Sequence, residues 1–426
     1  MIAPMLEKVL IVEDSSMVMK VIRHVAQQHN DFEFFYAENF TQAKKLIEDD
    51  GEQFFAALVD LNLPDAPDGE VVDYALERKI NTIVLTASFD ATRRSKLLEK
   101  GIVDYVTKEG RFSYEYALNL VRRIFKNRDI KVLIVDDSDT SRFFISTLLS
   151  YHLFQIFEAR NGMEAVQVLL DNPDIELMIT DYHMPKMDGA ELVRNIRHKY
   201  EKSELAIIGL SAEGDSNLSA KFIKNGANDF LHKSFNHEEF HCRVRHNIEA
   251  NEHVKQIREA ANRDYLTGVY NRRYFFSRGE SLHAQALANS VPLAAVILDV
   301  DDFKQLNDIY GYGGGDYLLQ EFSKLLNEAL GRFLVARPSG EEFFILMPGL
   351  DNGKAMALLG SVRELIAGTA MFIGDDTVYM TFSAGVTNQA GGSLQEQLNV
   401  ASGYLYRAKE AGKNLIIGDD GDEAGD

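Results

Sequence analysis

A length of 426 residues and a formal net charge of −20 at pH 7 set the first limits on this chain. The length predicts about three domains. The acidity argues against a nucleic-acid binder, because such proteins are usually basic, and suits a small anionic nucleotide held by a metal ion. Cys242 is the only cysteine, which excludes a disulfide framework and fits a reducing cytosol. With no apolar run of about 18 residues and no signal-peptide pattern, we expect a soluble, cytoplasmic protein without membrane contact.

An internal repeat fills the N-terminal part of the chain. The apolar run and acid pair of residues 9–14 return as residues 132–137, so that Asp14 and Asp137 lie 123 positions apart. Three further pairs recur at offsets of 121 to 125 residues, namely Asp60 with Asp181, Thr86 with Ser211, and Lys108 with Lys233. A duplicated domain explains this pattern.

Each copy alternates short apolar strands with amphipathic segments of helix length. The strands are expected at residues 56–60 and 82–86 in the first copy, and at 177–181 and 206–210 in the second. This βα alternation predicts a doubly wound parallel sheet with helices on both faces. Functional side chains then gather at the carboxyl ends of the strands.

The recurring polar residues have the chemistry of a phosphorylation site. Two acids at one strand end can bind Mg²⁺, and a third Asp at a neighbouring strand end can act as the nucleophile. A Thr or Ser hydroxyl can bond to the phosphoryl group, and a Lys can neutralise its charge. Both copies therefore predict an aspartyl phosphate.

Both copies resemble the flavodoxin-like receiver domains of response regulators, over residues 5–127 and 130–246. The resemblance implies a sensor histidine kinase or phosphotransfer protein as phosphodonor. In the first copy it implies Glu13 and Asp14 as metal ligands, Asp60 as phosphoacceptor, and Thr86, Tyr105 and Lys108 as switch residues. In the second it implies Asp136 and Asp137 as metal ligands, Asp181 as phosphoacceptor, and Ser211, Phe230 and Lys233 as switch residues.

The two copies depart from that family at the switch rather than at the acceptor. The loop from Asp60 to Gly69 is one residue longer than its counterpart in the second copy, and the usual Pro after the Lys is Glu109 or Ser234. One copy could instead be a dimerisation adaptor that accepts no phosphate. The second copy lies beside the C-terminal domain in the chain, so we expect it to be the switch.

Residues 247–263 have a polar helical pattern and are expected to link the second copy to the C-terminal domain. Apolar positions recur at Ile248, Val254, Ile257 and Ala261. Their spacing suits a helix that pairs with its copy in a dimer. A solvated spacer helix is the alternative.

Two acidic strand ends mark the C-terminal part of the chain. Residues 333–347 read as a hairpin whose Ser339-Gly340 turn is followed by Glu341 and Glu342. Residues 293–301 read as a buried strand that delivers Asp299 and Asp301 at its end. Side by side, Asp299 and Glu341 could share Mg²⁺ bound to a nucleotide.

Five separated motifs in a fixed order resemble the GGDEF domain of diguanylate cyclases, an α+β cyclase-like fold, over residues 264–418. They are residues 299–304, 306–308, 315–316, 339–343 and 408–414, and residues 264–273 match the opening motif of that family. The resemblance implies a homodimer that condenses two GTP molecules into cyclic di-GMP and two pyrophosphates, with Mg²⁺ as cofactor.

The resemblance also implies the site. It assigns Asp299, Glu341 and the carbonyl of Val300 to the metal, Glu341 and Glu342 to catalysis, Asn307 and Asp316 to guanine, and Lys304, Ser339, Gly340, Lys409 and Lys413 to the rest of the substrate. Four positions depart from the family: Tyr312, Pro338, Ser339, and Lys413 in place of Arg. Ser339 would carry a conformational cost if its φ had to be positive. The alternative function is a signalling scaffold whose degenerate domain binds GTP without turnover. Residues 419–426 are expected to be a disordered acidic tail.

Overall fold

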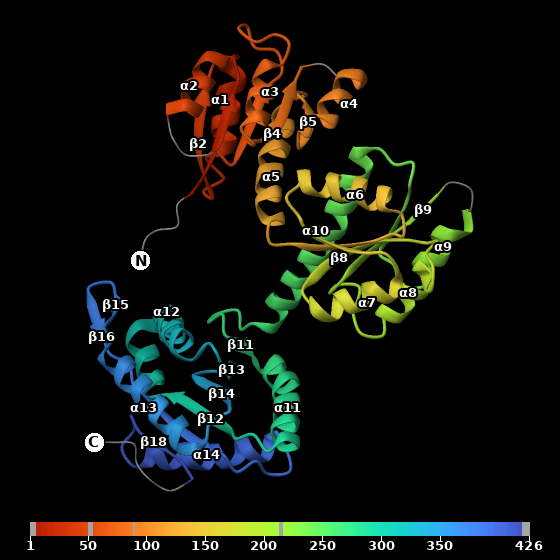
Figure 1. Ribbon diagram of the computed structural model, residues 1–426. Helices are drawn as coiled ribbons and strands as arrows, with labels where there is room; N and C mark the ends of the chain where they lie inside the picture. The colour runs from red at the N-terminus through yellow and green to blue at the C-terminus, as the bar shows by residue number, and fades with distance from the viewer. Residues whose placement is uncertain (1–5, 50–53, 88–89, 213–215, 420–426) are drawn as a thin grey trace. The chain divides into compact units, whose positions relative to one another are not determined.

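The computed structural model describes residues 6–49, 54–87, 90–212 and 216–419, and the expected tail beyond residue 419 lies outside them. The chain forms two compact units, which divide between Val254 and Lys255. The first unit holds two five-stranded sheets and the second a six-stranded sheet (Figure 1). No helix in the part of the chain that the structure describes combines the length and apolar character that a membrane crossing requires.

The first sheet is parallel and has the strand order β2-β1-β3-β4-β5. Alternate residues of β1, an inner strand of this sheet, enter two separate cores: Val9 and Ile11 pack with α1 and α5, whereas Leu10 and Val12 pack with α2, α3 and α4. A parallel sheet covered on both faces needs this continuous apolar strand. The elements are β1 (Glu7–Val12), α1 (Ser16–Ala26), β2 (Phe32–Ala37), α2 (Phe40–Asp49), β3 (Ala56–Asp60), α3 (Glu70–Glu77), β4 (Asn81–Thr86), α4 (Ala91–Glu99), β5 (Asp104–Thr107) and α5 (Arg111–Asn127).

The second sheet repeats the first, with the order β10-β9-β8-β6-β7, so the predicted doubly wound fold is confirmed for both copies. Helices α6 and α10 pack on one face, and α7, α8 and α9 pack on the other. The elements are β6 (Lys131–Val135), α6 (Asp139–Tyr151), β7 (Gln155–Ala159), α7 (Gly162–Asp171), β8 (Ile175–Asp181), α8 (Gly189–Ile196), β9 (Ala206–Ser211), α9 (Ser216–Lys224), β10 (Asp229–His232) and α10 (His237–Asn262).

The helix that follows this sheet corrects one sequence expectation. α10 begins at His237, well before the expected linker, and its first half covers the sheet with Phe240, Val244 and Ile248. Ile248 is therefore a core residue of the second copy and is not part of a stripe that could pair with another chain. Val254 and Ile257 remain exposed.

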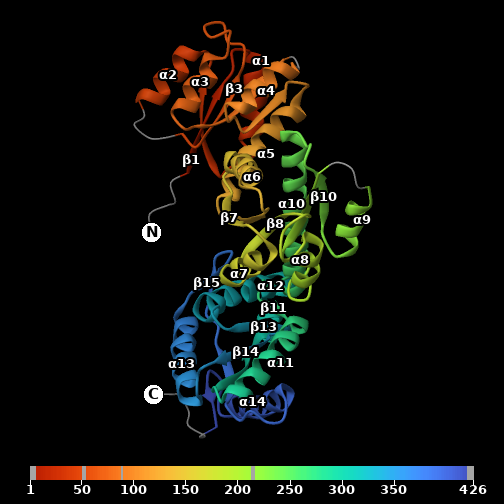
Figure 2. The same cartoon turned by 45° about the vertical axis from the view of Figure 1, so that its right-hand side comes forward.

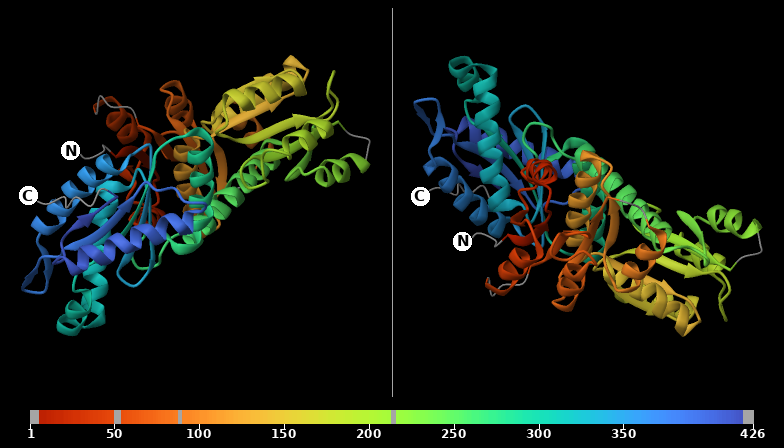
Figure 3. Two further views of the ribbon diagram at one scale, coloured as in Figure 1. Left: turned by 90° about the horizontal axis from the view of Figure 1, so that it is seen from below. Right: turned by 90° about the horizontal axis from the view of Figure 1, so that it is seen from above.

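The third sheet is mixed and has the order β11-β13-β14-β12-β17-β18. Helices α12 and α13 cover one face, and α11 and α14 cover the other (Figure 2; Figure 3). This is the predicted α+β architecture. The elements are β11 (Tyr270–Asn271), α11 (Arg272–Asn289), β12 (Leu293–Val300), α12 (Phe303–Leu330), β13 (Leu334–Ser339), β14 (Glu342–Pro348), α13 (Asn352–Gly368), β15 (Met371–Ile373), β16 (Asp376–Val378), β17 (Phe382–Thr387), α14 (Leu394–Glu410) and β18 (Ile416–Ile417).

Candidate functional site

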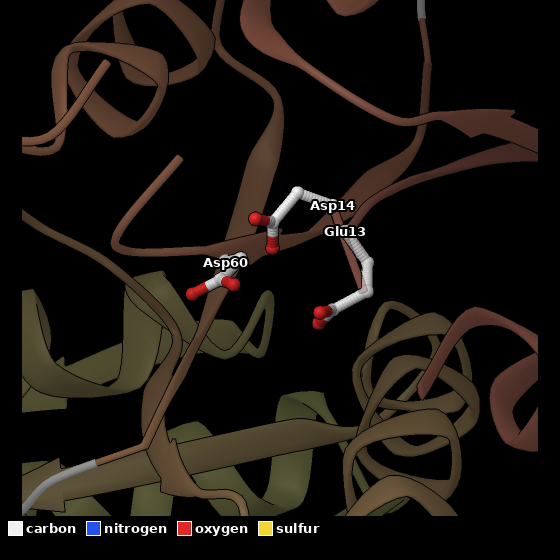
Figure 4. A group of neighbouring side chains, drawn as sticks. All are labelled: Glu13, Asp14 and Asp60. Carbon is white, nitrogen blue, oxygen red and sulfur yellow. The ribbon is translucent and has the colours of Figure 1, made fainter. Parts of the chain in front are cut away.

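Three acids gather at one edge of the first sheet. Glu13 and Asp14 follow β1, and Asp60 ends the neighbouring strand β3. One carboxylate oxygen from each lies within 4.8 Å of the others (Figure 4). Because hard divalent cations prefer several oxygen ligands, the cluster has the donors that Mg²⁺ requires.

A lysine from the far strand closes this cluster. Lys108 follows β5, and its Nζ donates to Oε2 of Glu13 at 2.6 Å and to Oδ2 of Asp60 at 2.7 Å. Burial raises the pKa of Glu13, and the Lys108 ammonium acts against that rise. The other two residues of the expected switch, Thr86 at the end of β4 and Tyr105 in β5, are both buried.

The second sheet carries the same arrangement. Asp136, Asp137 and Asp181 form the matching cluster, with one oxygen each within 4.8 Å of the others. Nζ of Lys233 lies 2.7 Å from Asp136 and 3.0 Å from Asp181, and burial raises the pKa of Asp181 against the pull of that ammonium. The expected switch residues lie in the neighbouring strands, the buried Ser211 at the end of β9 and Phe230 in β10.

The long acceptor loop of the first copy is fastened to two helices. Asp65 accepts hydrogen bonds at 2.9 Å from the backbone N–H groups of Phe40 and Thr41, which open α2, and from the Thr41 hydroxyl. Arg93 of α4 donates to Oδ1 of Asn62 at 3.2 Å. Asp65 of this longer loop therefore caps the first turn of α2.

The Asp65→Ala variant is expected to lose about 1–2 kcal/mol of unfolding free energy, the usual cost of removing a helix cap. Asp68→Ala, in the same loop, is the matched control and should lose much less. Urea unfolding followed by circular dichroism measures both. Equal losses would show that Asp65 does not act as a cap.

A buried histidine and a half-buried one lie where the two copies touch within the first unit. The rings of His152, which follows α6, and His241, in α10, stack with centroids 3.7 Å apart. Nε2 of His152 lies 3.1 Å from the carbonyl oxygen of Val103. The same contact carries the ion pairs of Arg94 with Glu238 at 2.6 Å and Arg123 with Glu252 at 2.8 Å, so α10 receives charged partners from both α4 and α5.

We expect acid to destabilise this contact. Burial lowers the pKa of His152 to about 4 and holds the pKa of His241 well below its usual value. The unfolded chain takes up these protons near pH 6.5, so the stabilisation is complete above that pH and is lost as the pH falls towards 4.

Between pH 7 and pH 5, proton uptake by His152 in the unfolded chain should by itself lower the free energy of unfolding by about 2 kcal/mol. Thermal unfolding at both pH values checks this. His152→Gln should reduce the dependence on pH, whereas the exposed His198→Gln should leave it unchanged. A dependence that survives His152→Gln in full would contradict this assignment.

The third sheet brings the acidic hairpin beside β12. β12 pairs with β14 in antiparallel register, which places Asp299 opposite Glu342. The backbone N–H of Val300 donates to the carbonyl of Glu341 at 3.2 Å. Asp299, Val300, Glu341 and Glu342 therefore meet at one edge of the sheet, as the sequence predicted.

The hairpin turn differs from the expected one. Ser339 is the last residue of β13 and pairs with Glu342, so the two loop residues are Gly340 and Glu341. The positive φ of 55° falls at Gly340 and not at Ser339. Because Ser339 does not need the left-handed conformation, the conformational cost considered for it does not arise.

The charges around Asp299 are crowded. Burial raises its pKa to about 6, the Lys409 ammonium opposes this rise with Nζ 2.6 Å from Oδ1, and Glu341 and Glu342 add to it. Three carboxylates with one nearby lysine leave an excess of negative charge that a divalent cation could balance. The chemistry of this donor set suits a metal ion, but its three carboxylates are not among the acid groups of the described residues whose oxygens lie within 4.8 Å of one another.

A kink in α12 lies between the two expected guanine-binding residues. Gly311, with φ 72° and ψ 170°, breaks the helix between Asn307 and Asp316. A Cβ on Gly315 would lie 1.9 Å from Oδ1 of Asn307, so Asn307 packs against the residue that precedes Asp316. Tyr312, beside the kink, is exposed.

The three lysines expected to bind phosphate occupy different positions. Lys409, in the last turn of α14, contacts Asp299. Lys413 follows that helix and donates instead to Oδ1 of Asp302 at 2.5 Å. Lys304 is exposed in the first turn of α12. Only Lys409 therefore contacts one of the expected metal ligands directly.

One ion pair of the hairpin was missed in the sequence. Arg337 donates from Nε to the carbonyl of Gly340 at 2.7 Å and from Nη1 to Oδ1 of Asp264 at 2.9 Å. Although burial acts to raise it, hydrogen bonds from Thr267 and Arg337 hold the pKa of Asp264 below its usual value. The pair ties the opening motif to the acidic turn. Opposite charges in two motifs were the only signal for it.

The two doubly wound sheets with acid clusters, followed by this mixed sheet, define a receiver-containing signalling protein. Family models agree: the response regulator receiver domain matches residues 9–113 and 132–245, and the diguanylate cyclase GGDEF domain matches residues 261–415. The receiver matches alone cover just over half of the chain. This chain belongs to the response regulators and carries two receiver domains followed by a GGDEF domain.

Individual relatives match part of this chain. The response regulator PleD of Caulobacter vibrioides is 28% identical over 300 residues, 68% of this chain and 65% of its own length. The probable diguanylate cyclase DgcT of Escherichia coli is 33% identical over 172 residues, 38% of this chain and 37% of its own. A crystal structure described as a putative two-component system response regulator/GGDEF domain protein is 43% identical with a TM-score of 0.53, and the match covers 58% of this chain and 99% of that one.

Proposed function

We propose that this chain is a phosphorylation-regulated diguanylate cyclase, which condenses two GTP molecules into cyclic di-GMP and two pyrophosphates across a homodimer. The observation that carries the proposal is the meeting of Asp299, Glu341 and Glu342 at one sheet edge, with Lys409 beside them. Phosphoryl transfer depends mainly on positioning and on charge neutralisation, and this edge supplies groups for both.

The reaction needs two protomers because each presents one GTP. The 3′-hydroxyl oxygen of one GTP attacks the α-phosphorus of the other, a P–O bond forms, and the bond to the β-phosphate breaks to release pyrophosphate. Glu341 accepts the hydroxyl proton, and Glu342 adds negative charge that favours its transfer. A second attack of the same kind, with the roles of the two nucleotides exchanged, closes the ring and releases the second pyrophosphate.

Asp299, Glu341 and the carbonyl of Val300 would hold Mg²⁺, which supplies charge neutralisation to the triphosphate when it is bound. Lys409 now neutralises Asp299 and would turn to the phosphates once a cation replaces it there. Lys304 and Lys413 are the further phosphate donors in this proposal, and the backbone of Ser339 and Gly340 borders the nucleotide.

Asn307 and Asp316 would read the guanine. An amide and a carboxylate match the acceptor and donor groups of that base. Asn307 packs against Gly315, the residue before Asp316, which supports a shared task.

The receivers would control how two GGDEF domains meet. A sensor histidine kinase or phosphotransfer protein would supply the phosphoryl group to Asp60 or Asp181. Mg²⁺ would bind beside each acceptor, to Glu13 and Asp14 in the first receiver and to Asp136 and Asp137 in the second. The switch residues Thr86, Tyr105 and Lys108, with Ser211, Phe230 and Lys233, would then respond to the phosphate.

Incubation of the purified protein with GTP and Mg²⁺, with and without acetyl phosphate, tests the proposal. Chromatography should reveal cyclic di-GMP, in larger amount with the phosphodonor. GTP that binds but stays intact under both conditions would overturn it and favour the signalling scaffold.

A further inference from the structure

Asp301 is a buried carboxylate that the proposed reaction leaves without a task. It is the first residue after β12 and is 7% exposed. Its two oxygens accept three hydrogen bonds, from the Thr381 hydroxyl at 2.9 Å, the Ser383 hydroxyl at 2.7 Å and the backbone N–H of Asn414 at 2.9 Å. These donors come from both ends of the segment that contains β17, α14 and the turn after it.

The turn that contributes Asn414 has an unusual backbone. Gly412, Lys413 and Asn414 have φ values of 127°, 65° and 49°. The left-handed conformation costs about 1–2 kcal/mol for a residue other than glycine, so two such residues in a row need support from their surroundings.

Hydrogen bonds and one ion pair supply that support. Besides the bond from Asn414 to Asp301, the N–H of Lys413 donates to the carbonyl of Ala408 at 3.2 Å, and Arg363 donates to the carbonyl of Asn414 at 3.1 Å. Nζ of Lys413 is held by Asp302, which itself has a φ of 54°. The acids that follow β12 thus hold both the backbone and the side chain of this turn.

Asp301 is poorly placed to be a second metal ligand. A carboxylate has about four positions for hydrogen bonds or ligands, and three of them are in use here. Asp299, two residues earlier, contacts Lys409 instead and lies opposite Glu342. Asp299 and Asp301 therefore have separate roles, although only Val300 lies between them in the sequence.

We propose that Asp301 is a positioning residue that fixes the Lys413 turn beside the end of β12. It thereby sets the place of the Lys413 ammonium relative to the metal-binding carboxylate Asp299 and so the affinity for the triphosphate. The inference rests on the proposed function. It adds to that function a residue that acts through another and touches neither GTP nor metal.

Steady-state kinetics with GTP and thermal unfolding of the full chain test this. Asp301→Asn keeps the shape but replaces an acceptor oxygen with a donor. We expect the KM for GTP to rise about tenfold, as for other residues that orient a ligand-binding group, with kcat changed much less. In a Lys413→Ala background the same substitution should have little further effect on KM, because the two residues act in one chain of contacts.

A second pair of variants guards against a folding defect. Thr381→Val removes one donor to Asp301 and should raise KM in the same direction by a smaller factor. Thr387→Val is the matched control. Thr381 immediately precedes β17 and Thr387 ends it, and the Thr387 hydroxyl donates to Asp419 at 2.6 Å and not to Asp301. This control should leave KM unchanged.

The outcomes separate the inference from the proposed function. Effects of Asp301→Asn and Lys413→Ala that multiply independently would overturn the inference, as would equal changes from Thr381→Val and Thr387→Val. If Asp301→Asn does not fold, the two threonine variants decide. If the unaltered protein forms no cyclic di-GMP, the proposed function fails. The Kd for Mg-GTP of the same variants, measured by calorimetric titration, then replaces KM in testing the inference.

Discussion

Cyclic di-GMP formation by the Asp299→Asn variant is expected to fall by roughly 10²- to 10³-fold, the usual cost of removing one electrostatic group from a transition-state site. Asn keeps the shape of Asp, but it cannot supply the negative charge that the proposed Mg²⁺ site would require. At the same register position β14 carries Glu342, which the proposed reaction already uses, and β17 carries the uncharged Ser383, so neither residue is free to replace Asp299.

Stability should change in the opposite sense from activity. Burial raises the pKa of Asp299 to about 6, so its charged form is disfavoured in the folded protein relative to the unfolded chain. Without metal at pH 8, Asp299→Asn should therefore unfold at the same temperature as the unaltered protein or at a higher one. The exposed Asp376→Asn, in β16, is the control and should change neither property. A loss of activity below tenfold would show that the reaction does not use this carboxylate.

The second large effect concerns regulation. Asp181→Asn is expected to abolish the stimulation of the cyclase by acetyl phosphate, a gain that we expect to be roughly 5- to 150-fold in the unaltered protein, the range of typical allosteric couplings. The reason lies in the chain path. Lys233 contacts Asp181, and α10 begins four residues later at His237 and continues to Asn262, inside the region that matches the GGDEF domain.

Asp60→Asn provides the comparison. It removes the acceptor of the first receiver, which contacts α10 through side chains such as Arg94 and Arg123 and is not continuous with it in sequence. We expect part of the stimulation to remain in this variant. Asp174 is an exposed acid of the second receiver, and the control variant Asp174→Asn should keep the full stimulation by acetyl phosphate. Full stimulation in Asp181→Asn and none in Asp60→Asn would assign the switch to the first receiver.

The sequence was informative wherever topology constrains the side chain. Parallel strands joined by helices bring their carboxyl ends to one edge, so the positions of Asp60 and Asp181 beside their acid pairs could be predicted from the strand pattern. The same holds for Asp299 and Glu342, because the hairpin and the buried strand were both visible as apolar runs.

Other features depend on one residue of register or on a distant partner. Whether a turn falls at Ser339 or at Gly340 changes which residue needs a positive φ, and a pattern of apolar runs cannot decide it. Ile248 has the spacing of a pairing stripe, but only the preceding sheet shows that it is buried. In the sequence Asp301 could not be distinguished in role from Asp299. Its hydrogen-bond donors Thr381 and Asn414 lie 80 and 113 positions further along the chain, so the local pattern does not reveal them.

The continuity of α10 has a further consequence. An α-helix turns by about 100° and advances by about 1.5 Å for each residue. One residue added to its exposed second half would therefore rotate everything after it by that angle, whatever the arrangement of the two units, whereas seven residues would nearly restore the phase and mainly lengthen the helix. The number of residues in this helix thus determines the rotation of the GGDEF domain about the helix axis. Insertion or deletion in the helix could change that rotation during evolution without changing either acid cluster.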